Sequence, residues 1–196
     1  METKKILRAK MKEKLSLMAK ENFTEKSSLI SKNLAFLFSS LNIIQNKDLV
    51  GAYAPISLEP LWFQETSGEL DSLIAYPAIG DKSDLMIFKM ARMSDLVIKK
   101  DFGFEILGPP TESPEVTPRL ILIPGLAFTE LGERLGRGKG FYDKYLSHFR
   151  GIKIGVCFSE QVVEMLPTEK HDVTLDYIVT DEKIINCSDA KKYKSK

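Results

Sequence analysis

The stretch LILIPGLAF, residues 120–128, decides the fold class. Its first four residues are all aliphatic, so a strand formed here has both faces buried and no polar side facing water. Pro124 and Gly125 end the run, because both residues favour turns over a continuing strand. Strands buried on both faces are typical of a mainly parallel sheet covered by helices.

Other short apolar runs have the same character and predict further strands, at residues 48–55, 72–79, 84–91, 152–158 and 176–181. Amphipathic stretches between them predict helices at residues 57–69, 140–150 and 159–166. Strands that alternate with helices indicate an α/β fold with a mostly parallel sheet.

Two helices are predicted before the first strand. In residues 3–21, apolar side chains recur at spacings of four, four and three, at Leu7, Met11, Leu15 and Met18. Lys4, Arg8 and Lys12 form a second stripe beside the apolar one, either as a solvated basic face or as the wall of a cleft. A second helix is expected over residues 24–41, with Thr24 as its N-cap.

The remaining segments complete a single domain over residues 1–196, in which the helices of residues 1–45 pack on the sheet. Residues 102–119 hold four prolines and two glycines and predict a long surface connection, a type of loop that is often functional. The lysine-rich tail, residues 190–196, is expected to fray.

Composition excludes several classes of protein. A net charge of +1 gives no overall field for nucleic acid or for a membrane surface, so any positive site must be local. Cys157 and Cys187 are isolated, which argues against a zinc site. The N-terminus is charged and no run approaches the roughly 18 apolar residues of a membrane span. We expect a cytoplasmic monomer that binds small molecules.

The stretch GERLGRGKGFYDKYL, residues 132–146, carries the strongest local signal. Gly136, Gly138 and Gly140 alternate with Arg137 and Lys139 just before a predicted helix. Glycine lets the backbone approach an anion closely, and the cations and the helix N-terminus attract it. The spacing fits neither a Walker A loop nor a dinucleotide fingerprint. The pattern therefore indicates a polyanion cradle, with a flexible basic loop as the alternative.

Two acidic residues extend this hypothesis to a metal ion. Asp143 lies in the first turn of the helix after the cradle, and Asp172 lies in a loop before the last predicted strand. A carboxylate beside bound phosphates commonly holds Mg²⁺, although turn chemistry is an alternative for either aspartate. His148 and His171 form no recognisable catalytic pair, so a covalent nucleophile is poorly supported.

Residues 124–146, PGLAFTELGERLGRGKGFYDKYL, resemble the core motif of the 5-formyltetrahydrofolate cyclo-ligase family. The resemblance extends to four further segments: KKILR at residues 4–8, AYAPISLEP at 52–60, FGFEILGPP at 102–110 and LPTEKHDVTLDYIVTDE at 166–182. It implies a three-layer α/β/α sandwich of Rossmann-like type, similar to sugar-phosphate isomerases and CoA transferases, with an N-terminal helical pair.

The resemblance also implies an activity, the ATP- and Mg²⁺-dependent closure of 5-formyltetrahydrofolate to 5,10-methenyltetrahydrofolate with release of ADP and phosphate. Arg137 and Lys139 would then be catalytic, and Asp143 and Asp172 would bind Mg²⁺. The implied ATP-binding residues are Lys4, Arg8, Arg134, Leu135, Gly136, Arg137, Gly138, Lys139, Gly140, Phe141 and Tyr142. The implied folate-binding residues are Ala54, Glu59, Phe104, Arg137, Gly138, Lys139, Gly140 and Phe141.

The chain departs from the family pattern after Glu59, where Pro60, Leu61 and Trp62 follow. Phe102 and Phe104 are both candidates to stack on the pterin, and Phe104 is preferred. Two other functions stay open: an enzyme of the sugar-phosphate isomerase or CoA-transferase type, and a module whose basic loop and neighbouring aromatics bind RNA.

Overall fold

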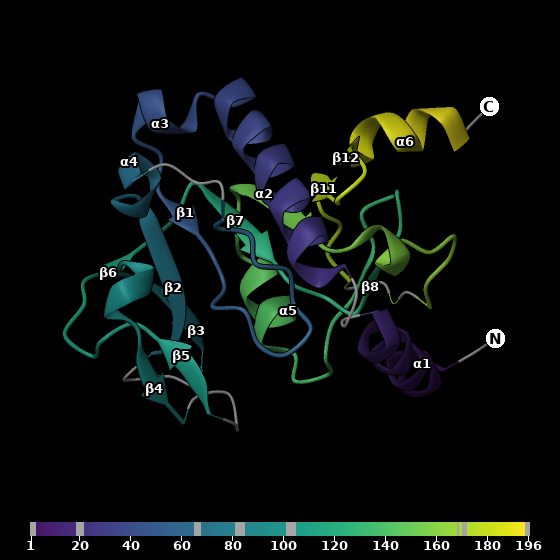
Figure 1. Cartoon of the computed structure of the whole chain (residues 1–196), viewed down its shortest axis with the longest axis horizontal. Helices are drawn as coiled ribbons and strands as arrows, with labels where there is room; N and C mark the ends of the chain where they lie inside the picture. Colours follow the sequence, from purple (N-terminus) through teal and green to yellow (C-terminus); the bar gives the residue numbers. More distant parts are fainter. Residues whose placement is uncertain are drawn as a thin grey trace.

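A computed structural model describes residues 3–18, 22–64, 68–80, 85–100, 105–167, 169 and 172–194 (Figure 1). Within these residues the main sheet has eight strands in the order β12-β11-β10-β7-β1-β2-β3-β6. They are β1 (Val50–Gly51), β2 (Ile74–Ile79), β3 (Met86–Met90), β6 (Glu115–Val116), β7 (Leu120–Ile123), β10 (Ile152–Val156), β11 (Tyr177–Val179) and β12 (Ile184–Asn186). The five strands from β11 to β2 are parallel neighbours, and antiparallel pairs occur only toward the two edges, which confirms the mostly parallel sheet.

Both faces of β7 are buried, as its sequence predicts. Leu120 and Leu122 belong to one core cluster, and Ile121 and Ile123 belong to the other, because successive side chains of a strand point to opposite faces. The first cluster includes residues of α1 (Lys4–Met18), α2 (Phe23–Ser40) and α3 (Ile43–Asn46). The second includes residues of α5 (Phe141–Leu146) and α6 (Cys187–Lys194). Helices therefore cover both faces, which confirms the three-layer sandwich, and α1 to α3 contribute to the core cluster on one face.

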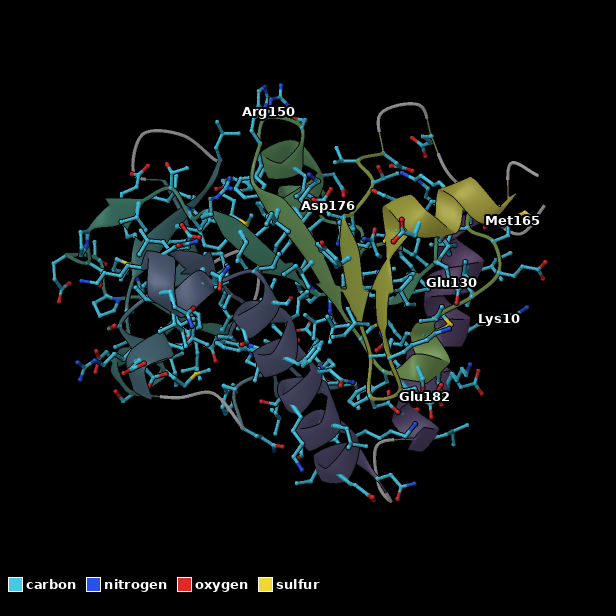
Figure 2. The ribbon with its side chains drawn as sticks, turned by 90° about the horizontal axis from the view of Figure 1, so that it is seen from above. Lys10, Glu130, Arg150, Met165, Asp176 and Glu182 are labelled. Atoms are coloured by element: carbon cyan, nitrogen blue, oxygen red, sulfur yellow. The ribbon has the colours of Figure 1, made fainter. Side chains whose placement is uncertain are left out.

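Parallel strands place their carboxyl ends at one edge of the sheet. Figure 2 illustrates this direction: Arg150 and Asp176, which precede β10 and β11, lie toward one end of the molecule, and Glu182, which follows β11, lies at the other. From β1 the chain continues to its neighbour β2, whereas from β7, on the other side of β1, it continues to β10. The connections leave β1 and β7 in opposite directions, so a topological switch point lies between them, where α/β sheets commonly bind ligands.

The prediction of a helix over residues 57–69 is wrong. Within the described part of this segment, residues 57–64 form turns and irregular structure, and a short helix, α4 (Gly68–Asp71), begins at its end. Pro60 supplies no backbone N–H, and a proline disfavours helical conformation in the residue before it. Trp62 fixes the loop instead, because its buried indole donates a hydrogen bond to the Tyr53 carbonyl at 2.8 Å.

Two other helices are shorter than predicted. Residues 159–166 contain only a single 3₁₀ turn, η2 (Ser159–Gln161). The buried Gln161 side chain stabilises this turn, since it accepts a hydrogen bond from Phe158 N and donates one to the Gly125 carbonyl. Residues 140–150 form a helix only as far as Leu146.

The two N-terminal helices are confirmed, but their ends differ from the prediction. Asn22, and not Thr24, is the N-cap of α2, and its side chain makes no capping hydrogen bond. α6 extends past Ala190 to Lys194, and the fraying expected for residues 190–196 stays a prediction. The helix is supported at its start, where the Asn186 side chain accepts a hydrogen bond from Ser188 N.

Residues 105–119 contain more regular structure than the long connection that was expected over residues 102–119. They contain β5 (Ile106–Gly108), which forms an antiparallel hairpin with β4 (Val97–Lys99), and β6 at the edge of the main sheet. A 3₁₀ turn, η1 (Met93–Asp95), precedes this hairpin. After β7, the chain forms a second hairpin from β8 (Ala127–Phe128) and β9 (Arg134–Leu135), which leads directly into the glycine-rich turn.

Within the described residues, no helix combines the length and the apolar character that crossing a bilayer requires.

Gly155 of β10 is predicted to be essential for close packing in the second core cluster. A Cβ atom there would lie 2.8 Å from Leu175 Cδ1 and 2.8 Å from Phe128 Cε1. We expect Gly155→Ala to lower the free energy of unfolding by about 1–3 kcal/mol in urea denaturation, as overpacked cores do. Gly68→Ala is the control, because nothing lies within 4 Å of its added Cβ. Equal stability of the two variants would contradict the prediction.

Candidate active site

A pocket lies at the carboxyl edge of the sheet, at the switch point between β1 and β7. Segments that follow these two strands line it, with Tyr53 to Glu59 after β1 and Pro124 after β7. The glycine-rich turn and the start of α5 form a second side. Pro77 of β2, Met86 of β3 and the β5 residues Ile106 and Leu107 add apolar surface. The pocket thus joins an apolar part to a basic part.

Glu59 and Arg137 form an ion pair across the pocket. Arg137 Nε donates to Glu59 Oε1 at 3.0 Å, and Ile56 N donates to Glu59 Oε2 at 3.1 Å. The Glu59 side chain is only 7% exposed, whereas that of Arg137 is 31% exposed. Burial raises the pKa of the Glu59 carboxyl, and the charge of Arg137 opposes this effect without cancelling it. The carboxylate is held in place by contacts from both sides of the pocket.

Arg134 supports the start of α5. Its guanidinium donates to the Pro124 carbonyl at 3.1 Å and forms an ion pair with Asp143. The same guanidinium lies over the Tyr142 ring, with Cζ 5.6 Å from the ring centroid. Because the Arg134 side chain is only 6% exposed, its main role in the unliganded protein is to fix the turn and the helix relative to each other.

The glycine-rich turn needs glycine at two of its three positions for backbone reasons. Gly138 and Gly140 have positive φ angles of 99° and 75°, which side chains other than glycine rarely adopt. Arg8 of α1 packs against this turn, where its Nε donates to the Gly136 carbonyl at 2.9 Å. Lys139 is exposed at the tip of the turn and has no ion-pair or hydrogen-bond partner within the described residues. The positive charge of Lys139 is therefore not paired with a negative charge from the described part of the protein.

Lys4 and Asp172 lie together, and neither lines the pocket. Lys4 Nζ lies 3.0 Å from Asp172 Oδ2 and 3.0 Å from Glu169 Oε1. The pairing joins α1 to the loop before β11. It leaves the predicted roles of Lys4 toward ATP and of Asp172 toward Mg²⁺ untested.

The structure brings most of the predicted site residues to the pocket. They are Ala54, Glu59, Arg134, Gly136, Arg137, Gly138, Lys139, Gly140, Phe141, Tyr142 and Asp143. Lys4, Arg8, Leu135 and Asp172 do not line it, and the Leu135 side chain lies in the first core cluster. Phe102, Phe104 and His171 lie outside the described residues.

Sequence reasoning missed several residues of the apolar wall: Tyr53, Ile56, Pro77, Met86, Ile106, Leu107 and Pro124. Tyr53 and Pro124 closely follow β1 and β7, so the rule that ligands bind at carboxyl ends points to them once the strand ends are known. Ile106 and Leu107 belong to a hairpin that no local pattern predicted, and their signals were the length of the connection that contains them and the resemblance of residues 102–110 to the family.

Magnesium fits Asp143 better than Asp172. Asp143 lines the pocket beside the basic turn, its side chain is 55% exposed, and only its Oδ1 is engaged by Arg134. Mg²⁺ usually takes one or two carboxylates together with substrate phosphates, and an exposed carboxylate suits this mode. No group of three or more histidine, cysteine or acidic side chains suited to a metal occurs among the described residues. Any magnesium site here would depend on the phosphates for its other ligands.

Both the sequence and the structure of this chain are similar to those of known proteins. The sequence profile of the 5-formyltetrahydrofolate cyclo-ligase family matches residues 1–181. The chain belongs to this family. The solved structure of 5,10-methenyltetrahydrofolate synthetase from Aquifex aeolicus superposes with a TM-score of 0.77 at 27% identity, covering 94% of this chain and 92% of that one.

Curated relatives of the family are similar over parts of the chain. The 5-formyltetrahydrofolate cyclo-ligase of Mycolicibacterium smegmatis is 31% identical over 144 residues, which cover 68% of this chain and 74% of the relative. The probable cyclo-ligase of Schizosaccharomyces pombe is 38% identical over 84 residues, or 36% of this chain. That alignment spans 41% of the length of the yeast relative.

The raised pKa of Glu59 predicts a pH dependence of stability. Its folded-state pKa lies above the ordinary value of 4.5, so the folded protein binds the proton more tightly than the unfolded chain does. The contribution of Glu59 to stability is therefore greatest below the ordinary pKa and falls as pH rises through the raised one. We expect the unfolding free energy of the native protein, relative to Glu59→Gln, to decrease as pH rises above the ordinary value of 4.5 in denaturant titrations. If the unfolding free energy relative to Glu59→Gln increases over this pH range, the folded-state pKa of Glu59 is not raised.

Proposed function

We propose that this protein catalyses the ATP-dependent cyclisation of 5-formyltetrahydrofolate to 5,10-methenyltetrahydrofolate, with release of ADP and phosphate. Membership of the cyclo-ligase family supports the reaction. The single structural observation that carries it is the pocket at the switch point, where a basic glycine-rich turn faces a buried carboxylate across an apolar wall. The basic side suits phosphates, and the apolar side with Glu59 suits a flat ring that has N–H groups.

The chemistry requires activation of a poor electrophile. The nitrogen lone pair of a formamide delocalises into its carbonyl, so the second folate nitrogen does not attack the carbon unaided. Transfer of the γ-phosphoryl group from ATP to the formyl oxygen creates a leaving group. The second nitrogen then forms the new carbon–nitrogen bond, loses its proton, and the carbon–oxygen bond breaks as phosphate departs. No protein nucleophile takes part in this sequence.

The side chains of the pocket are suited to positioning and to charge stabilisation. Phosphoryl transfer depends mainly on alignment of donor and acceptor and on neutralisation of charge on the transferred group. Lys139 and Arg137 lie on the turn that lines the pocket and would stabilise this charge. Glu59 would accept hydrogen bonds from ring nitrogens of the folate and so orient the formyl group. Lys4 and Arg8 would extend the ATP contacts along α1.

Mg²⁺ is proposed as a cofactor held by Asp143, with Asp172 as a second candidate. When bound, the ion neutralises part of the phosphate charge. Arg134 engages Oδ1 of Asp143, which leaves Oδ2 for the ion.

The decisive experiment is a cyclisation assay on the purified protein, in which the absorbance of methenyltetrahydrofolate is followed. We expect product only when ATP is present, and its loss when a chelator removes Mg²⁺. Excess Mg²⁺ added after the chelator serves as the control and should restore the reaction. Product formed equally without ATP, or no product under any condition, would refute the proposed function.

Lys139→Ala separates a catalytic cation from a structural one. Because Lys139 is exposed and has no partner within the described residues, its loss should leave the melting temperature unchanged. Removal of one charge-stabilising contact typically costs about 3 kcal/mol, so turnover should fall about a hundredfold. Lys32→Ala, an exposed lysine of α2, is the matched control and should keep full turnover. A melting temperature that falls together with turnover would indicate a structural turn instead.

A further inference from the structure

Gln161, at the end of η2, is almost completely buried and uses both ends of its side-chain amide. The residue is 1% exposed. Its Oε1 accepts a hydrogen bond from Phe158 N at 2.9 Å, within its own turn. Its Nε2 donates to the Gly125 carbonyl at 2.8 Å and to the Leu126 carbonyl at 3.3 Å, 36 and 35 positions away in the sequence. The amide therefore joins η2 to the segment that follows β7.

That segment, residues 124–126, contributes to the wall of the pocket. Pro124 lines the pocket, and its carbonyl accepts a hydrogen bond from Arg134 Nη1 at 3.1 Å. Three consecutive carbonyl groups are thus held by two side chains, the first by Arg134 and the next two by Gln161. Gln161 itself does not line the pocket, so this segment is what connects it to the site.

The turn that carries Gln161 is itself fixed to the rest of the fold. Ser159 N donates to Asp181 Oδ1 at 2.6 Å, and the Asp181 side chain is only 4% exposed. Lys26 of α2 forms ion pairs with Asp181, at 3.0 Å, and with Glu160. Contacts from α2 and from the end of β11 therefore give the Gln161 amide a fixed base, from which it holds the segment after β7.

Arg134 links the same segment to the start of α5. Its guanidinium donates to the Pro124 carbonyl, forms an ion pair with Asp143 and lies over the Tyr142 ring. A shift of the Pro124 carbonyl would therefore displace the guanidinium and, with it, the Asp143 carboxylate. Displacing groups that position a substrate by about 1 Å can cost up to about a hundredfold in rate.

We infer that Gln161 is a positioning residue for the cyclisation. Its amide fixes residues 124–126 and, through the Pro124 carbonyl, the Arg134 guanidinium and the Asp143 carboxylate. This inference rests on the proposed function. The competing assignment is a purely structural one, in which Gln161 stabilises η2 and the fold without affecting turnover by the folded enzyme.

Gln161→Met separates these two assignments. Methionine is flexible and unbranched but has no group that donates to a carbonyl, so residues 124–126 lose both contacts. We expect kcat to fall about tenfold, measured at saturating substrates and at a temperature where circular dichroism shows the variant to be folded. A structural role would lower the melting temperature and leave kcat of the folded protein unchanged.

A double-mutant cycle shows whether Gln161 acts through Arg134. Arg134→Lys keeps the positive charge but loses the planar fork that contacts Pro124 and Asp143. In the Arg134→Lys background, Gln161→Met should lower kcat by less than about threefold, because the effects of coupled residues are not additive. An equal loss in both backgrounds would overturn the inference, since the two side chains would then act independently.

Gln161→Glu adds a readout that depends on pH. A protonated carboxyl has one O–H donor and an acceptor oxygen, so it can replace the amide, whereas the ionised form only accepts. Burial beside two carbonyl oxygens should raise the pKa of the introduced carboxyl. Relative to the unmodified protein at the same pH, kcat of this variant should be nearly normal at acidic pH and decrease as pH rises. The relative loss in Gln161→Met should not depend on pH.

Asn33→Asp is the matched control for the change from amide to carboxyl. Asn33 Nδ2 also donates to a backbone carbonyl, that of Thr180, at 2.8 Å, but neither residue lines the pocket. The kcat of this variant should equal that of the unmodified protein at every pH.

Three further results would overturn the inference while the proposed function stands. They are an unchanged kcat in folded Gln161→Met, a relative kcat of Gln161→Glu that does not decrease with pH, and failure of both variants to fold, since Gln161 would then be structural. If the unmodified protein catalyses no cyclisation, the proposed function fails, and the inference fails with it.

Discussion

The adjacency of β1 and β7 is the constraint on which the site depends. Parallel pairing of these strands places both carboxyl ends at one edge, and their outgoing connections diverge because the chain continues to opposite sides of the sheet. The ion pair between Glu59 and Arg137 then joins the segment after β1 to the turn after β9, across 78 positions of sequence. Without the strand pairing, neither the carboxylate nor the basic turn would have a partner, and the pocket would not exist.

Charge compensation within the protein follows from this arrangement. Three carboxylates at or near the site are each paired with a cation: Glu59 with Arg137, Asp143 with Arg134, and Asp172 with Lys4. Burial of charge is unfavourable unless the charge is paired, so these contacts stabilise a site rich in ionisable groups before any ligand binds. A bound polyphosphate would compete with the carboxylates for the same cations. Lys139 differs from these cations, since it has no partner within the described residues and is available to an arriving anion at once.

The sequence predicted the elements whose signals are local and strong. The aliphatic run of β7, buried on both faces, led directly to the parallel sheet, and the stripe that includes Met11 and Leu15 led to α1. The alternating glycines led to the turn that lines the pocket. Weaker signals were overridden by tertiary contacts: the loop after Glu59 is held by Trp62, and η2 is held by Gln161, where helical periodicity alone predicted longer helices. The β4–β5 hairpin depends on cross-strand pairing, which the pattern of residue types along the chain hardly predicts.

In the site, too, the sequence predicted the features that have a local signal and missed those that depend on tertiary contacts. Residue type and spacing identified the groups that carry charge, because arginine, lysine and aspartate near glycines imply an anion. They did not identify the apolar wall, since Met86, Ile106 and Leu107 are ordinary apolar residues until the fold brings them to the pocket that Glu59 also lines. The wall matters as much as the charges. It lowers the local dielectric around Glu59, which raises the pKa of that carboxyl and strengthens each hydrogen bond that a ligand makes there.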